Sequence, residues 1–200
     1  MTNGQKMPKV PLKTMPAIQL VDTIGNITNL LELAKGRVTL IDFWFIPCGP
    51  CFQEMKMLHK IYNDFRSNAN FLFLTITFSD SAFVKNLIEN RNTDNNEVYD
   101  YFKSLSKLDT FSLPVYFLKD YSTKMKHFKR NNNGKGFSGS NLSYPKNDAI
   151  SPESIFGFQA YPTTLVYDKT GKLIYNRTGF SPKNELQELK EIEKMVKSNL

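Results

Sequence analysis

The feature that most constrains this chain is a pair of cysteines between a strongly apolar segment and an amphipathic one. Cys48 and Cys51 are the only cysteines among the 200 residues. The segment before them, Val38–Trp44, is rich in β-branched and aromatic residues and predicts a buried strand. The segment after them, Phe52–Phe65, carries apolar residues at helical spacing, and Pro50 suits the first turn of a helix. The sequence therefore predicts a strand, a short connection and a helix that begins at the cysteines.

This spacing has a chemical consequence for the two thiols. Residues three positions apart on a helix have Cβ atoms about 5–6 Å from each other, so a modest adjustment lets the two sulfurs bond. Cys48 lies at the positive end of the helix dipole, where free N–H groups stabilise a thiolate. Such motifs lower the thiol pKa from about 8.5 to as little as about 3.5–7.5. We expect Cys48 to be the nucleophile and Cys51 to resolve the mixed disulfide, although two small buried apolar residues are the alternative.

One acid interrupts the apolar strand. Asp42 stands where an apolar side chain is expected. Burial there would raise its pKa toward neutrality, which suits a general acid or base. The alternative is that Asp42 only caps or hydrogen-bonds the backbone.

The rest of the chain predicts alternating strands and helices. We expect a first hairpin from Ala17–Val21 and Ile27–Thr28, followed by a short helix at Asn29–Ala34. A strand is expected at Phe71–Phe78, parallel to Val38–Trp44. The end of this second strand, at Ser79-Asp80, is expected to line the site. Helices are expected at Phe83–Ile88, at Glu97–Leu108, after a Ser151 cap and after Ser181-Pro182, the last with solvated acids. Strands are expected at Val115–Leu118, Thr163–Tyr167 and Leu173–Asn176, and the glycine-rich stretch Asn131–Ser143 is expected to be a mobile loop.

Composition excludes several function classes. The net charge is +7, but Lys and Arg are scattered, so we expect no nucleic-acid partner. A structural zinc site needs four ligands, and a metal site here would require His59 and His127 to converge on the cysteines. No run of 18 apolar residues occurs, so we expect no membrane span in this chain. The glycine-rich stretch has no flanking strand and helix, which argues against nucleotide binding.

Three motifs together resemble a known family. The residues Asp42, Trp44, Cys48-Gly49-Pro50-Cys51 and Tyr161-Pro162-Thr163-Thr164 resemble the active-site strand, redox motif and cis-proline loop of the thioredoxin superfamily. The flanking stretches Leu20–Ile27 and Val166–Leu173 are similar to exported thiol reductases of the TlpA/ResA type. The resemblance covers about residues 17–78 and 156–200.

The resemblance implies a fold and a domain organisation. The expected fold class is α/β, a thioredoxin-like central mixed β-sheet flanked by helices, with an N-terminal β extension. We expect residues 1–15 to be a flexible tail and residues 16–200 to form a single domain with an enlarged insertion at about residues 90–151.

The resemblance also implies roles for individual residues. Asp42 would shuttle a proton to and from Cys51. Pro162 would be cis, with the Tyr161 backbone offering strand-like hydrogen bonds to a substrate. Trp44 would shield the disulfide.

The resemblance also bears on Pro47 and Glu54. Pro47 is expected at the substrate-binding surface, together with Tyr161, Pro162 and Trp44. TlpA-like proteins usually carry tryptophan or threonine at this position, just before the first cysteine. Glu54 either matches a glutamate common after the motif in TlpA-like proteins or is an exposed first-turn acid.

The expected function is thiol–disulfide exchange. Reduction of protein disulfides is the favoured direction, because Gly-Pro between the cysteines resembles the reducing thioredoxins. The partners would be protein disulfide substrates and an upstream electron donor, with no bound cofactor and a monomeric protein. Family resemblance favours a periplasmic or cell-envelope location, although this chain opens without a signal segment, and the cytoplasm is the alternative.

Three other functions are alternatives for this chain. The first is a non-catalytic binding or chaperone module, and the second is a metal-delivery module, although related copper chaperones space their cysteines by three residues rather than two. The third, a thiol peroxidase, needs Pro-x-x-x-Thr/Ser-x-x-Cys, and Ile41 and Phe45 occupy the required positions.

Overall fold

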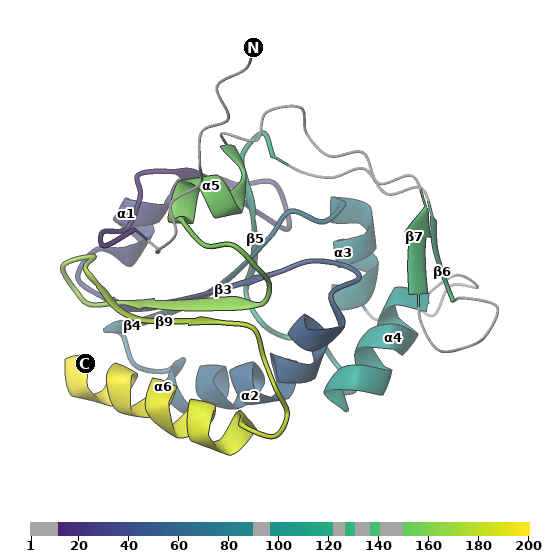
Figure 1. Ribbon diagram of the computed structural model, residues 1–200. Coiled ribbons are helices and arrows are strands. Elements are labelled where there is room, and N and C mark those ends of the chain that lie inside the picture. Colours follow the sequence, from purple (N-terminus) through teal and green to yellow (C-terminus); the bar gives the residue numbers. More distant parts are fainter. Residues whose placement is uncertain (1–11, 90–96, 122–126, 131–136, 141–149) are drawn as a thin grey trace, which may run out of the picture.

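The computed structural model describes residues 12–89, 97–121, 127–130, 137–140 and 150–200. Its centre is a seven-stranded mixed sheet in the order β2-β1-β5-β4-β3-β8-β9 (Figure 1). The strands are β1 Gln19–Asp22, β2 Ile27–Asn29, β3 Val38–Trp44, β4 Phe71–Thr77, β5 Val115–Leu118, β8 Thr163–Tyr167 and β9 Leu173–Thr178. β3 pairs in parallel with β4 and antiparallel with β8, so the predicted parallel pair is confirmed.

Helices cover both faces of this sheet (Figure 1). α2 (Gly49–Phe65) and α6 (Glu185–Asn199) lie on one face, and α1 (Leu30–Ala34) and α5 (Pro152–Phe156) lie on the other. α3 (Ser81–Ile88) and α4 (Glu97–Ser106) lie at the side, with α4 packed on α2. The expected α/β thioredoxin-like fold is confirmed.

β3 decides which side chains face the redox helix. All seven of its residues are buried, and successive side chains point to opposite faces. Leu40 and Trp44 belong to the core beneath α2, whereas Ile41 and Phe43 belong to the core beneath α1 and α5. By this alternation Asp42 points into the core on the α2 side.

The N-terminal segment differs from its expected form. Residues 1–11 of the expected tail lie outside the described residues, but residues 12–15 contact the domain. Met15 N donates to Gly171 O at 2.8 Å, and Leu173 N donates to Lys13 O at 2.8 Å. Met15 is also buried and belongs to the part of the core that lies beneath α5. The packed region therefore begins before residue 16.

The expected glycine-rich loop also differs. β6 (His127–Arg130) pairs antiparallel with β7 (Phe137–Ser140), so part of Asn131–Ser143 is a strand. Backbone pairing needs no apolar side-chain pattern, which is why the composition gave no sign of it. The remainder of that stretch, residues 131–136 and 141–143, lies outside the described residues.

Two helices begin or end away from their predicted boundaries. The helix expected to run to Leu108 ends at Ser106, and Lys107 follows with a positive φ of 60°. The final helix begins at Glu185, and Asn184 precedes it without a side-chain cap, instead of beginning at Ser181-Pro182. The predicted Ser151 cap with Pro152 in the first turn is confirmed.

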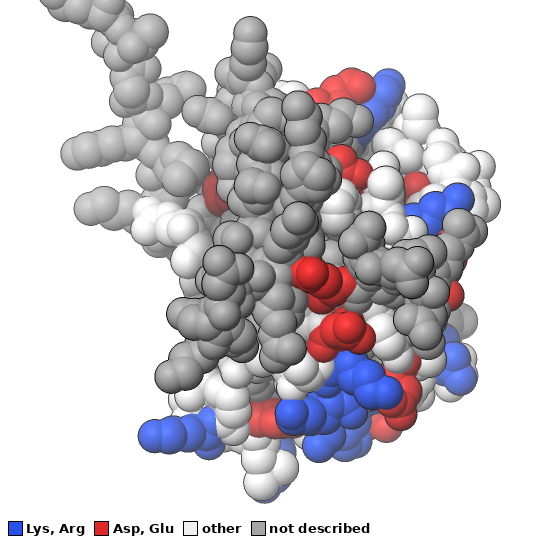
Figure 2. All heavy atoms as spheres, turned by 90° about the vertical axis from the view of Figure 1, so that its right-hand side faces the viewer, with Lys and Arg blue, Asp and Glu red and all other residues white. Residues whose placement is uncertain are grey.

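The surface that carries α3, α4, β6 and β7 shows charges of both signs (Figure 2). On its described part, acidic and basic side chains are neighbours. Lys103 of α4 pairs with Asp109 at 2.7 Å. Among the helices that the structure describes, none combines the length and apolar character required to span a membrane.

Candidate active site

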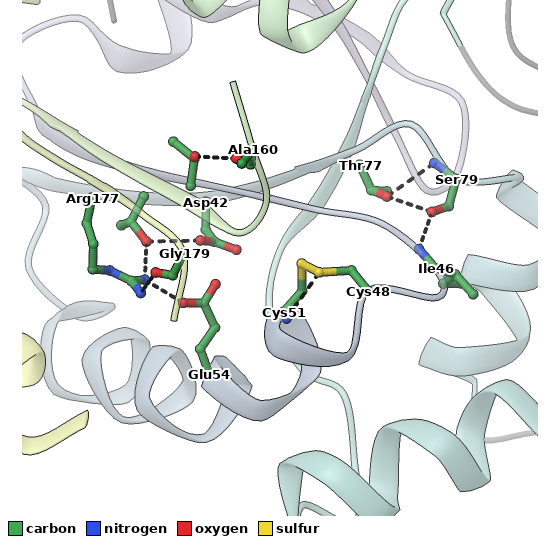
Figure 3. The surroundings of a disulfide bond; sticks show 12 residues. Asp42, Ile46, Cys48, Cys51, Glu54, Thr77, Ser79, Ala160, Arg177 and Gly179 are labelled. Carbon is green, nitrogen blue, oxygen red and sulfur yellow. Dashed lines mark hydrogen bonds and ion pairs between the residues drawn. A yellow bond between two sulfur atoms is a disulfide. The ribbon is translucent and has the colours of Figure 1, made fainter. Parts of the chain in front are cut away.

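The two cysteines lie at the start of α2 and form a disulfide (Figure 3). Cys48 is the N-cap residue, and its Sγ accepts a hydrogen bond from Cys51 N at 3.2 Å. Cys48 retains 7% of its surface, whereas Cys51 is fully buried. The two thiols are therefore unequal, because an attacking molecule reaches only the first.

The loop before Cys48 is fixed by the end of β4, as expected for strands whose carboxyl ends meet at one edge. Ile46 N donates to Ser79 Oγ at 2.8 Å, and Ser79 in turn contacts Thr77 Oγ1 at 3.1 Å (Figure 3). Cys48 N donates to Phe45 O at 2.8 Å. The Ile46–Pro47 peptide bond is cis, and Pro47 is half-buried next to Cys48.

The Tyr161–Pro162 peptide bond is also cis, as predicted. Pro162 O accepts from Gly179 N at 2.7 Å, so the end of β9 holds this loop. The Tyr161 ring packs edge-on against Phe45 at 5.1 Å, which places the proline loop next to the loop that leads to Cys48. Tyr161 is half-buried and Pro162 is buried.

Trp44 lies in the core and not at the surface, where a substrate-contacting residue is expected. It is fully buried, with its ring centroid 5.3 Å from that of Phe111 and 6.0 Å from that of Phe52. A direct contact with a substrate is therefore excluded in this structure, because the core encloses the ring. The ring packs against Phe52, the residue after Cys51, and its shielding role stays a prediction.

Asp42 lies fully buried between β8 and α2. Its Oδ1 accepts a hydrogen bond from Thr164 Oγ1 at 3.1 Å. Burial raises the pKa of Asp42 to about 6, against opposing effects of the Arg177 charge and of hydrogen bonds. This carboxyl group thus changes protonation close to neutral pH.

Glu54 is a second buried acid, which corrects the alternative that it is an exposed first-turn residue. It lies one turn after Cys51 on α2, retains none of its surface and forms an ion pair with Arg177 of β9 (Figure 3). Burial raises its pKa well above the usual value, and the neighbouring Asp42 charge raises it further.

Arg177 was not identified from the sequence. Its Nη2 donates to Glu54 and, at 2.7 Å, to Thr164 Oγ1, while Nη1 donates to Gly179 O at 2.6 Å. Nη1 also pairs with Glu188 of α6 at 3.0 Å. The expectation that the acids of α6 are simply solvated is therefore wrong for Glu188. A buried acid requires a counter-charge, so a basic partner could be expected from the sequence. The sequence does not identify which Lys or Arg supplies that charge.

A helix of the expected insertion reaches the redox motif. Tyr101 of α4 packs against Phe52 with ring centroids 5.5 Å apart. A Cβ atom at position 49 would lie 2.8 Å from Tyr101 Oη. Glycine between the cysteines therefore suits the close approach of α4.

The structure offers little support for the metal alternative. His59 is buried, its ring nitrogens contact Ser112, and burial lowers its pKa to about 4, so it is neutral at pH 7. The side chain of His127 lies outside the described residues. Within the described part of the chain, no three His, Cys, Asp or Glu side chains are grouped as metal ligands.

The arrangement of disulfide, sheet and helices is that of the thioredoxin-like thiol–disulfide oxidoreductases, with a Cys-x-x-Cys motif. The family model described as Redoxin matches residues 4–135, more than half of the chain, and the chain belongs to this family. No curated protein matched it significantly.

Solved structures agree on the fold. The thioredoxin domain of a thiol-disulfide oxidoreductase from Bacteroides vulgatus is 19% identical, with a TM-score of 0.54 and coverage of 94% of this chain and 98% of that one. A protein assigned as the thiol:disulfide interchange protein DsbE from Chlorobium tepidum is 16% identical, with a TM-score of 0.52 and coverage of 96% and 99%. A thiol-disulfide oxidoreductase from Bacteroides fragilis is 18% identical, with a TM-score of 0.51 and coverage of 90% and 99%.

Proposed function

We propose that this protein reduces disulfides in other proteins, with Cys48 as nucleophile and Cys51 as resolving thiol. The observation that carries the proposal is the unequal burial of the two cysteines at the start of α2. The helix N-terminus favours a thiolate at Cys48, and the buried Cys51 is protected from outside partners.

The reaction runs in two exchange steps. The Cys48 thiolate attacks one sulfur of the substrate disulfide, so a mixed disulfide forms and the other substrate sulfur leaves as a thiolate. Cys51 then loses its proton, and its thiolate attacks Cys48 Sγ, which releases the second substrate thiol and leaves the Cys48–Cys51 disulfide. An upstream dithiol donor must supply two electrons to restore the reduced form, and no bound cofactor is required.

Asp42 is proposed as the group that receives and returns the Cys51 proton. Its pKa of about 6 suits a base at neutral pH, and it points to the α2 side of the sheet. The substrate chain is proposed to lie across Pro47, Tyr161 and Pro162. Similarity to exported thiol reductases supports a cell-envelope location.

The direction of electron flow is tested by the reduction potential of the Cys48–Cys51 couple, measured by equilibration against glutathione or dithiothreitol buffers. We expect a value near or below about −220 mV, in the range of glutaredoxins and thioredoxins. A value near about −120 mV would identify an oxidant instead.

The roles of the two cysteines are tested by trapping. Cys51→Ser should accumulate a mixed disulfide with a protein substrate, because nothing resolves it, whereas Cys48→Ser should form none. If the double variant Cys48→Ser/Cys51→Ser keeps full biological activity, the exchange function is wrong and a binding module takes its place.

A further inference from the structure

Asp42 and Glu54 form a buried carboxyl pair. Each has one oxygen engaged by a neighbour, Asp42 Oδ1 by Thr164 and Glu54 Oε2 by Arg177. The other two oxygens, Asp42 Oδ2 and Glu54 Oε1, are buried and have no hydrogen-bond partner in the described part of the chain. The two carboxyl groups face each other in Figure 3, and each affects the pKa of the other.

The closeness of the two carboxyl groups limits the charge on the pair. Ionised carboxylates only accept hydrogen bonds, and no donor stabilises a charge on the two buried, unpartnered oxygens. Two negative charges this close in a buried site do not both persist, because each disfavours the ionisation of the other. One shared proton leaves one negative charge, which the Arg177 guanidinium balances.

The contacts of Arg177 link its charge to both acids. The guanidinium pairs directly with Glu54. Arg177 Nη2 also donates to Thr164 Oγ1, and the Thr164 hydroxyl donates to Asp42, so the hydrogen bonds run in one direction from the cation to Asp42. Asp42, with a pKa of about 6, is the carboxyl group of the pair that is ionised near pH 7 and can accept a proton.

Other titratable groups border the pair. Glu188 of α6 pairs with the outer side of Arg177 at 3.0 Å. Tyr175 of β9 lies within electrostatic reach of Arg177 and Glu54, and Glu191 of α6 lies within reach of Tyr175. Glu188, Glu54 and Asp42 all act on Arg177, so Glu188 competes with the pair for its charge.

We propose that Arg177 is a positioning residue for the exchange reaction: with Thr164 it holds Asp42 and Glu54 as a pair with one proton and one negative charge, and this pair, rather than Asp42 alone, accepts the proton that Cys51 loses and returns it to the departing substrate thiolate. The proposal rests on the function proposed above and assigns to β9 a part in a reaction whose sulfur chemistry takes place on α2.

The test is the pH profile of the resolving step. Reduced protein is mixed in a stopped-flow instrument with 5,5′-dithiobis(2-nitrobenzoic acid), which releases one coloured thiolate when Cys48 reacts and a second when Cys51 attacks Cys48. In Arg177→Met the pair loses its counter-charge, so the inflection of the second release should move up by about 1–3 pH units. The second release at pH 7 should slow by about tenfold or more.

Three variants separate charge from structure. Arg177→Lys restores the charge without the planar fork and should return the inflection most of the way to the original pH. Glu188→Gln frees the Arg177 charge for the pair, so it should move the inflection down, opposite to Arg177→Met, and it keeps the proposal testable if Arg177→Met does not fold. Arg66→Met, which changes an arginine at the far end of α2, should leave the profile unchanged.

The outcomes distinguish the two proposals. If the wild type shows no second release, the exchange function fails. If the second release occurs and Arg177→Met has the same inflection as the wild type, only the role of Arg177 fails. Equal shifts in Arg177→Lys and Arg177→Met, or a Glu188→Gln profile that moves up, would also overturn the role of Arg177, since they would indicate a structural effect without a charge effect.

Discussion

At the scale of single residues, the site is defined by groups whose burial opposes their charge. Asp42 stands in the middle of a strand that is otherwise packed with apolar side chains, and no aqueous contact stabilises its ionised form. The folded state therefore holds a proton on Asp42 at pH values where the unfolded chain releases it. An acid in this position lowers stability at neutral pH, which accords with the proton-transfer role proposed for Asp42.

This argument predicts a pH-dependent gain in stability for Asp42→Asn. The pKa of Asp42 is raised from 3.8 to about 6, so the stability of the wild type falls as pH rises through this window and stays low above it. At pH 7.5, Asp42→Asn should raise the free energy of unfolding by up to about 3 kcal/mol, since one pKa unit corresponds to about 1.4 kcal/mol. At pH 4 the gain should largely disappear. Urea titrations of the oxidised proteins at both pH values measure it.

Asp64→Asn is the matched control, because Asp64 is an exposed acid of α2 paired with Lys60. Its effect should stay within about 0.5 kcal/mol at both pH values. A gain for Asp42→Asn that is equal at pH 4 and pH 7.5 would contradict the proposed protonation of Asp42.

At the scale of elements, α4 and β9 bring side chains to α2 from distant parts of the chain. β9 contributes Arg177, and α4 contributes Tyr101, whose hydroxyl lies against Gly49. The redox motif therefore has neighbours on two sides, α4 and β9, that cannot be inferred from the residues of the motif itself. The contact with α4 also limits the size of the residue between the cysteines.

A double-mutant cycle tests this contact. Gly49→Ala should lower the free energy of unfolding by about 1 kcal/mol, because the new methyl group meets Tyr101 Oη. In a Tyr101→Phe background the loss should shrink or reverse, since the obstructing oxygen is gone and alanine favours a helix over glycine by about 0.5–1 kcal/mol. Urea unfolding of the four proteins gives the coupling energy, expected to be at least about 0.5 kcal/mol.

Tyr99→Phe serves as the comparison for that cycle, because Tyr99 is on the same helix and its hydroxyl bonds to Asp109 O instead. It should show no coupling with Gly49→Ala. Equal costs of Gly49→Ala with and without the Tyr101 hydroxyl would mean that α4 does not restrict the motif.

At the scale of the whole molecule, one sheet holds the parts of the site in fixed relation. The end of β4 holds the loop before Cys48, β3 supplies Asp42, and β8 and β9 supply Thr164 and Arg177. Because helices pack on both faces of this sheet, changes at the disulfide are linked to the stability of the entire domain. The redox state and the folding equilibrium therefore form one thermodynamic cycle.

That cycle predicts the sign of a stability difference. If the protein is a reductase, its disulfide is more favourable in the folded protein than in the unfolded chain, so the oxidised form should unfold at higher urea concentration than the reduced form. A potential difference of 30 mV between the folded and unfolded couples corresponds to about 1.4 kcal/mol. Urea titrations with and without dithiothreitol measure the difference, and a more stable reduced form would indicate an oxidant.

The sequence by itself determined the parts of this protein that depend on local patterns. Hydrophobic periodicity predicted β3, α2 and the parallel β4, the spacing of Cys48 and Cys51 predicted their pairing, and Asp42 was conspicuous as the single acid of an apolar strand. The tertiary structure alone decided the partners: Glu54 with Arg177 across 123 positions, and Ile46 with Ser79 across 33. The physical reason is that a side chain's partner depends on the order of strands in the sheet and on which helix packs over them. Neither can be read from residues that are neighbours in the chain.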